Sequence, residues 1–247
     1  MQTTTDLNCD MGEGMLTDAL IMPFISSANI ACGFHAGSDD TIRRTVELCL
    51  EFNVAAGAHP SFNDKENFGR KEQTWEPASL YELVSDQLRI FEKNAFKLGC
   101  TMHHVKPHGA LYNMAAKDKW MSSVIVKAIK DFDENLLVYG LAGSHLISEA
   151  EAIGLKAVNE VFADRTYQDD GSLTPRSLPG SLIGNEEQAL HQVLQMVRQQ
   201  RVTAISGKWF PVRADTICIH GDGPHAVTFA QSIYQYLKAH QIDIKTI

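Results

Sequence analysis

Near its middle the chain reads Val105-Lys106-Pro107-His108-Gly109-Ala110-Leu111-Tyr112. An apolar run ends here in a lysine and a histidine, at a point where a proline and a glycine break the backbone pattern. Parallel α/β folds place their chemistry at such junctions, where a strand ends and the chain turns toward a helix. The stretch therefore predicts a parallel sheet with Lys106 and His108 at its functional edge.

The same construction recurs along the chain, and each copy is an apolar run that ends in ionisable groups beside glycine or proline. Because the carboxyl ends of parallel strands meet at one edge, a single shared polar site is predicted. The other copies are Asp6-Leu7-Asn8-Cys9-Asp10, Ala31-Cys32-Gly33-Phe34-His35, Gly57-Ala58-His59-Pro60, Phe162-Ala163-Asp164-Arg165 and Ile217-Cys218-Ile219-His220-Gly221-Asp222.

Hydrophobic periodicity predicts strands that alternate with helices through almost the whole chain. About seven such units in 247 residues favour one TIM-like barrel of parallel strands, spanning residues 1–247, with helices around it. The predicted strands cover 3–9, 28–33, 54–58, 102–106, 136–141, 157–162 and 216–219, with a short doubtful one at 202–205. The predicted helices cover 39–52, 77–98, 117–131, 144–153, 186–200 and 224–240.

Composition excludes several classes of protein. With 30 acidic and 22 basic residues the net charge is −8, and no cluster of Lys and Arg could follow a phosphate backbone, so nucleic acid is not an expected partner. The N-terminus lacks the features of a signal peptide, and no apolar stretch approaches the roughly 20 residues that span a bilayer. We therefore expect a cytoplasmic protein without membrane contact. Five cysteines without a C-x-x-C pair indicate neither a disulfide framework nor a zinc-thiolate site.

Polar side chains share one face of several predicted strands. Asp6, Asn8 and Asp10 alternate with apolar residues, so they point together into the barrel, where they need a ligand, a metal or one another. Glu13 follows in the next turn. By the same alternation His104 lies on the side of Lys106 and His108, and Glu160 on the side of Asp164. Lys106 is expected to pair with Asp164 or Asp222, or to hold a substrate oxygen. Further candidates for acid, base and anion clamp are Asp164, Arg165, His220 and Asp222.

Three histidines, His35, His59 and His108, end consecutive strands. With a carboxylate such as Asp10 they have the composition of a site for a divalent metal that keeps an open position for water. An acid-base and hydrogen-bonding network uses the same residue types, and both interpretations stay open on spacing alone.

Two long polar segments, 61–76 and 167–185, interrupt the alternation. Loops of this length in a compact domain are usually functional or disordered. Each follows a strand that ends in one of the motifs, so we expect both to act as lids over the same site. Arg70 and Arg176 are the candidates to contact an anion there, and a solvated arginine is the alternative for each.

Taken together, the motifs resemble those of the LamB/YcsF family. The resemblance covers the chain in order and rests on Asp6-Leu7-Asn8-Cys9-Asp10-Met11-Gly12-Glu13, Ala28-Asn29-Ile30-Ala31-Cys32-Gly33-Phe34-His35-Ala36-Gly37, Gly57-Ala58-His59-Pro60-Ser61, Lys106-Pro107-His108-Gly109-Ala110-Leu111-Tyr112-Asn113, Phe162-Ala163-Asp164-Arg165 and His220-Gly221-Asp222. It implies a barrel distantly similar to carbohydrate deacetylases. It also implies one component, the A component, of an ATP-dependent 5-oxoprolinase, which with B and C partner subunits opens 5-oxo-L-proline to L-glutamate while ATP becomes ADP and phosphate.

The resemblance also implies roles for particular residues. By analogy with the deacetylases, Asp10, His59 and His108 would hold a divalent metal, with His35, Lys106, Asp164 and His220 as acid-base or anion-binding groups. The chain departs from the family pattern at Ser38-Asp39 and at Lys71. Two other functions remain as alternatives: an ATP-independent, metal-dependent amidase or deacetylase acting on a sugar or small amide, and a protein that binds the substrate without catalysis.

Overall fold

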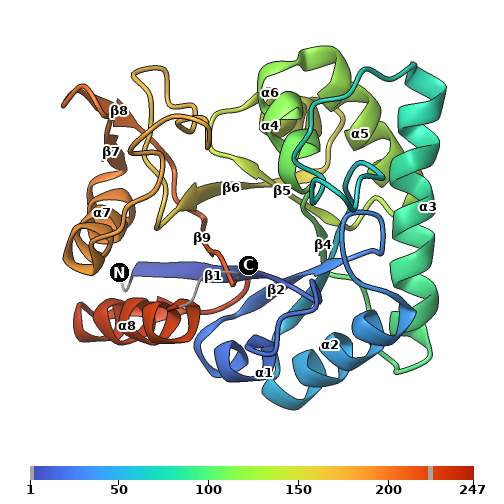
Figure 1. Cartoon of the computed structure of the whole chain (residues 1–247), viewed down its shortest axis with the longest axis horizontal. Helices are drawn as coiled ribbons and strands as arrows, with labels where there is room; N and C mark the ends of the chain where they lie inside the picture. The colour runs from blue at the N-terminus through green and yellow to red at the C-terminus, as the bar shows by residue number, and fades with distance from the viewer. Residues whose placement is uncertain (1–2, 222–224) are drawn as a thin grey trace.

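The computed structural model describes residues 3–221 and 225–247. Seven parallel strands form a closed barrel, because β1 pairs with β2 on one side and with β9 on the other (Figure 1). This confirms the predicted barrel of about seven parallel strands. The strands are β1 (Thr3–Met11), β2 (Ser27–Ala31), β3 (Ala55–His59), β4 (His104–Val105), β5 (Leu137–Leu141), β6 (Lys156–Phe162) and β9 (Thr216–Ile219).

Three further strands of the described residues lie outside the closed barrel. β10 (Ile242–Ile244) runs parallel to the first residues of β1. β7 (Arg201–Thr203) and β8 (Trp209–Pro211) form a separate antiparallel pair. The doubtful strand at 202–205 is therefore real but shorter, and it does not enter the barrel. The sequence pattern indicated neither β8 nor β10.

Helices cover the outside of the barrel, as Figure 1 shows for α2, α3, α5 and α8. They are α1 (Asp18–Ile21), followed by a short 3₁₀ turn at Met22–Phe24, α2 (Asp39–Phe52), α3 (Pro77–Phe96), α4 (Gly109–Lys117), α5 (Lys119–Phe132), α6 (His145–Ala152), α7 (Glu186–Gln199) and α8 (Ala226–Ala239). The predicted start of the last helix at Pro224 lies outside the described residues.

Helix α4 was not predicted, yet it positions part of the site. Its first residue, Gly109, has φ +57°, and the preceding His108 is extended. A Pro-His-Gly sequence is typical of a turn, and a nine-residue helix behind it gives little periodicity. The chain can begin a helix here because glycine adopts the left-handed backbone conformation at low cost.

The two faces of β1 carry different side chains, as the alternation predicted. Leu7, Cys9 and Met11 are buried in the apolar layer between barrel and helices. Asn8 points into the barrel, where its Nδ2 donates to Glu160 Oε1 on β6 at 3.0 Å. Strands buried on both faces are expected in a parallel barrel. Here the inner layer is polar, so its groups must satisfy one another.

No helix in the described part of the chain combines the length and the apolar character needed to cross a lipid bilayer.

Segment 167–185, one of the two expected lids, is held by isolated bridges between Arg165 and Leu182 and between Tyr167 and Leu173. Segment 61–76 is anchored to the start of α4, because the N–H of Ala110 donates to the carbonyl of Gly69 at 2.9 Å.

Candidate active site

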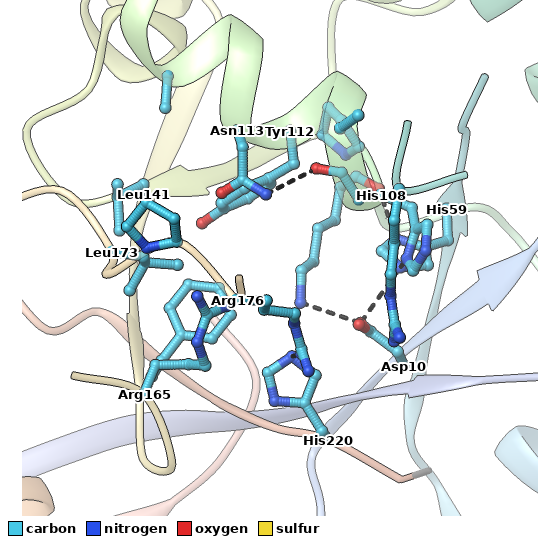
Figure 2. A pocket seen from close by; sticks show the side chains of 18 of the residues that line it. Asp10, His59, His108, Tyr112, Asn113, Leu141, Arg165, Leu173, Arg176 and His220 are labelled. Atoms are coloured by element: carbon cyan, nitrogen blue, oxygen red, sulfur yellow. Dashed lines mark hydrogen bonds and ion pairs between the residues drawn. The ribbon is translucent and has the colours of Figure 1, made fainter. Parts of the chain in front are cut away.

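A cavity of about 350 Å³ lies at the carboxyl ends of the barrel strands. Both long segments contribute to its wall, with Arg70 from 61–76 and Arg176 from 167–185. Figure 2 shows two sides of the cavity: His59 and His108 lie on one, and Arg165 lies on the other. The shared polar site expected from the strand-end motifs is thus present, and the two segments overhang it.

Lys106 is the buried cation at the base of the cavity. Its Nζ lies 2.9 Å from Asp10 Oδ1 and 2.7 Å from Glu160 Oε1, and it contacts Asn8 Oδ1 at 3.2 Å. Burial opposes the charge of this ammonium, but Asp10 and Glu160 outweigh that effect and raise the pKa of Lys106 well above its ordinary value. The lysine is therefore a fixed positive charge.

The partners of Lys106 correct one expectation. Asp164 does not pair with Lys106 but with His220, and Asp222 lies outside the described residues. The lysine instead crosses the barrel to Asp10 on β1 and Glu160 on β6. Burial alone would raise the pKa of Asp10, whereas its interactions with His59 and Lys106 hold it well below its usual range.

Glu160 is fully buried and collects three donors. Besides Lys106 and Asn8, the hydroxyl of Tyr112 donates to its Oε2 at 2.7 Å. Burial and the adjacent carboxylate raise the pKa of Tyr112 well above its ordinary value, so the phenol keeps its proton. Tyr112 lines the cavity but was not among the predicted site residues. If helix α4 had been predicted, the spacing of four residues between His108 and Tyr112, about one helical turn, would have indicated Tyr112 as a site residue.

Asp164 and His220 form a hydrogen-bonded dyad under the second segment. His220 Nδ1 lies 2.8 Å from Asp164 Oδ2, and Arg176 Nη2 lies 3.0 Å from His220 Nε2. Burial would raise the pKa of Asp164, but the interaction with His220 and the hydrogen bond from its Nδ1 lower that pKa below its usual value. Since the carboxylate only accepts hydrogen bonds, Nδ1 of His220 carries the proton. The ring nitrogen Nε2 is then the acceptor and faces the cavity side.

Arg165 is a buried guanidinium in the cavity wall, with 4% of its surface exposed. Its Nε donates to the carbonyl of Ser181 at 3.3 Å and its Nη2 to that of Thr174 at 2.6 Å. Both carbonyls belong to segment 167–185. Burial lowers the pKa of Arg165 to about 10, so it stays charged at neutral pH. Among described residues its Nη1 has no hydrogen-bond partner, which leaves donors for a ligand.

The histidines predicted to bind metal do come together. His59 Nε2 lies 2.9 Å from His108 Nδ1 and 3.4 Å from Asp10 Oδ1. His35 stacks on His108 with ring centroids 3.9 Å apart, and its Nε2 is 3.1 Å from Glu13 Oε1. Burial lowers the pKa of His35 to about 3 and also holds that of His108 well below its ordinary value. Glu13 is thus part of the site, beside the histidines.

Six of the predicted site residues that the structure describes do not line the cavity. Four of them, Asn8, His35, Glu160 and Asp164, contact residues that do. The other two, Asp6 and His104, make their contacts elsewhere in the barrel. Asp6 accepts hydrogen bonds from the hydroxyls of Ser26, Ser27 and Thr216, deeper in the barrel. His104 stacks on Tyr139 at 4.1 Å and binds Asn29 Oδ1 through Nε2 at 2.8 Å. Neither lines the cavity, although both share a strand face with residues that do. Their contacts indicate a structural role.

Fold and site together define a closed (β/α) barrel that carries a buried, ionisable site at the carboxyl ends of its strands. The chain belongs to the LamB/YcsF family, whose model matches residues 5–247. A curated relative from Tolumonas auensis, 50% identical over 98% of each chain, is named as the "A" subunit of 5-oxoprolinase. A solved lactam utilization protein from Thermus thermophilus superimposes with a TM-score of 0.93 at 39% identity, over 99% of this chain and 100% of that one.

More distant solved structures resemble this chain in fold alone. A family 4 carbohydrate esterase from Streptomyces lividans has a TM-score of 0.55 at 10% identity, over 99% of this chain and 93% of the other. The likeness to an esterase agrees with the expected barrel architecture.

Proposed function

We propose that this chain is the lactam-hydrolysing component of an ATP-dependent 5-oxoprolinase, converting 5-oxo-L-proline to L-glutamate while ATP becomes ADP and phosphate. The names of the 50% identical relative and of the lactam utilization protein support this activity. The B and C partner subunits, ATP as co-substrate and a cytoplasmic location are parts of the same proposal. The relative's name, which includes the word subunit, supports the existence of partners.

One observation in the structure carries the proposal. The same cavity brings together a buried arginine with donors to spare, a fixed lysine charge and an Asp-His dyad. A five-membered lactam is a stable amide, and phosphorylation of its carbonyl oxygen would make the carbon electrophilic. Attack by water then needs a base, a cation near the developing negative charge and an acid for the leaving nitrogen. The cavity offers a group for each. Loss of the nitrogen leaves an acyl phosphate, which a second water cleaves to glutamate and phosphate.

Arg165 is suited to bind the carboxylate of 5-oxo-L-proline. A guanidinium presents paired donors that match a carboxylate, and burial at 4% exposure strengthens that contact. Arg176 and Arg70, which reach the cavity from the two overhanging segments, are the proposed contacts for a second anion such as a phosphoryl group. Closure of segments 61–76 and 167–185 over the cavity would then depend on both the substrate carboxylate and the second anion.

His220 is the proposed proton carrier. Its Nδ1–H is held by Asp164, so its Nε2 can accept a proton from water and return it to the leaving nitrogen. In this structure the guanidinium of Arg176 is hydrogen-bonded to Nε2 of His220, and an anionic ligand would draw that guanidinium away. Lys106, fixed by Asp10 and Glu160, supplies positive charge at the base of the cavity where an oxyanion develops.

Glutamate release from 5-oxo-L-proline and ATP tests the proposal, with the purified chain alone and then mixed with candidate B and C partners. Activity in the mixture that is lost with His220→Gln is the expected result. Hydrolysis of simple amides by the chain alone, without ATP, would instead indicate the amidase or deacetylase alternative. Unchanged turnover in the His220→Gln and His108→Ala mixtures, with weakened substrate binding, would indicate a protein that only binds the substrate.

A further inference from the structure

The rings of His59 and His108 lie nearly perpendicular, at 78°, and bring one nitrogen of each ring together. Nε2 of His59 lies 2.9 Å from Nδ1 of His108. Such a distance suits a hydrogen bond only if one of the two nitrogens carries a proton. Which nitrogen carries it depends on what the opposite side of each ring contacts.

Both opposite nitrogens face backbone carbonyls. His59 Nδ1 lies 2.7 Å from the carbonyl oxygen of Lys106, and His108 Nε2 lies 3.0 Å from that of Phe68. A carbonyl only accepts, so each of these nitrogens carries the single hydrogen of a neutral imidazole. The two facing nitrogens are then both lone pairs. They repel each other unless a positive ion, either a proton or a metal, lies between or beside them.

A carboxylate completes a set of ligands at this point. Glu13 Oε1 lies 3.7 Å from His108 Nδ1, and Glu13, His35, His59 and His108 each offer a ligand atom within 4.8 Å of the others. Atoms this close can share one ion, since zinc lies about 2.0–2.2 Å from nitrogen and carboxylate oxygen ligands.

His35 is better suited to orient Glu13 than to bind the ion. Its Nδ1 is buried without a hydrogen-bond partner among the described residues. A bare lone pair there costs less than an unpaired N–H, so the hydrogen belongs on Nε2, which donates to Glu13 Oε1 at 3.1 Å. A hydrogen bond to a ligating carboxylate is a usual outer contact of metal sites.

Asp10, the carboxylate expected from the sequence, is a poorer ligand. Its Oδ1 already accepts from Lys106 Nζ at 2.9 Å and from Asn29 Nδ2 at 2.9 Å. A metal ion on that oxygen would lie beside a buried ammonium, and the two positive charges would repel each other.

We propose that His59 Nε2, His108 Nδ1 and the carboxylate of Glu13 bind one transition metal ion of the zinc type, with His35 orienting Glu13. Two imidazoles and one carboxylate leave a fourth position open, as in catalytic zinc sites. The backbone carbonyl of Phe68 keeps His108 in place. Glycine at position 69 lets this loop lie close to the histidines, because a Cβ there would lie 2.1 Å from Ser61 Oγ. The site goes beyond the proposed reaction and does not depend on it.

Metal binding by the full chain tests the site. After removal of metal with a chelator, Zn²⁺ is titrated calorimetrically and bound metal is counted by elemental analysis, while the visible spectrum of the Co²⁺ form reports the ligands. We expect one ion per chain. Glu13→Gln should weaken binding about tenfold or more, and His35→Gln by a similar factor through lost orientation. Asp10→Asn, the matched carboxylate-to-amide change, should weaken binding less than Glu13→Gln does.

Several outcomes would overturn the proposal. Wild-type chain that binds no stoichiometric Zn²⁺ or Co²⁺ would show that a proton lies between the two histidines. Weaker binding in Asp10→Asn than in Glu13→Gln would move the site to Asp10. Circular dichroism of each metal-free variant establishes folding. If Glu13→Gln does not fold, His35→Gln alone decides, since unchanged affinity in that variant contradicts the assigned geometry.

Discussion

His220 Nδ1 lies 2.8 Å from Asp164 Oδ2, and this contact fixes which ring nitrogen of His220 is available to a ligand. Asp164 follows strand β6 and His220 follows β9, neighbouring strands whose paired register brings Glu160 opposite Thr216 and Phe162 opposite Cys218. The dyad is therefore set by the barrel and not by a mobile loop. Arg176 is the contact that a ligand must displace.

Replacing His220 with glutamine should lower kcat for glutamate formation by about 10²–10⁴-fold, the usual contribution of a general acid-base group. Asp164→Asn should lower kcat less, because the histidine remains but loses the carboxylate that holds its tautomer. The measurement is glutamate release by the reconstituted enzyme at saturating substrate and ATP. His191→Gln on the exposed face of α7 is the matched control. Equal rates for His220→Gln and this control would remove His220 from the mechanism.

Arg165→Gln should raise KM for 5-oxo-L-proline about 10–100-fold, because a hydrogen bond to a charged group contributes about 1.5–3 kcal/mol. The change should have little effect on a lactam without a carboxylate, such as 2-pyrrolidinone, so the ratio of kcat/KM for the two lactams is the quantity to measure. Arg213→Gln, which removes an exposed arginine bonded to Asp215, is the control. A ratio that does not move would mean that Arg165 only anchors segment 167–185.

Asp6→Asn should change the pH dependence of folding stability. Burial raises the pKa of Asp6 above its ordinary value of 3.8, and this effect exceeds the lowering by the hydroxyls of Ser26, Thr216, Ser27 and Tyr139. The folded state thus holds a proton that the unfolded chain has released, and this contribution to stability is lost as pH rises through the folded pKa. The free energy of unfolding of Asp6→Asn minus that of wild type should therefore increase with pH in this window and level off above it.

Urea unfolding at a series of pH values from acid to neutral measures this difference. Glu92→Gln, on the exposed face of α3, is the control and should show no such rise. A difference for Asp6→Asn that is flat or falls with pH would contradict the assignment. Turnover should be retained, because Asp6 does not line the cavity.

Gly69→Ala should cost more stability than Gly99→Ala. Both glycines have a left-handed backbone, with φ +64° and +69°, so both variants incur about 1–2 kcal/mol of backbone strain. At Gly69 a Cβ would also lie 2.1 Å from Ser61 Oγ and 2.9 Å from His35 Cβ, whereas at Gly99 it meets nothing within 4 Å. Overpacking should add about 1–3 kcal/mol at Gly69. Equal losses in urea unfolding would mean that the loop moves aside freely.

Sequence reasoning reached the barrel because periodicity and strand-end motifs are local signals. The alternation in β1 correctly separated Leu7, Cys9 and Met11 from the inward Asn8. The strand-end position of His59, His108 and Lys106 likewise follows from an apolar run and the glycine or proline that ends it. These features depend on neighbours a few residues away, which any parallel barrel preserves.

The contacts between side chains on opposite sides of the barrel could not be predicted from such local signals. Residues on one strand face share a direction but not a depth, since each step of two residues moves about 6–7 Å along the strand. Asp6 and His104 therefore lie below the cavity that Asp10 and Lys106 reach. The pairing of Lys106 with Glu160, the contact of Tyr112 through an unpredicted helix and the approach of Glu13 to His108 depend on register between distant segments. Only closure of the barrel fixes that register, because the hydrogen bonds that set it join residues far apart in the chain.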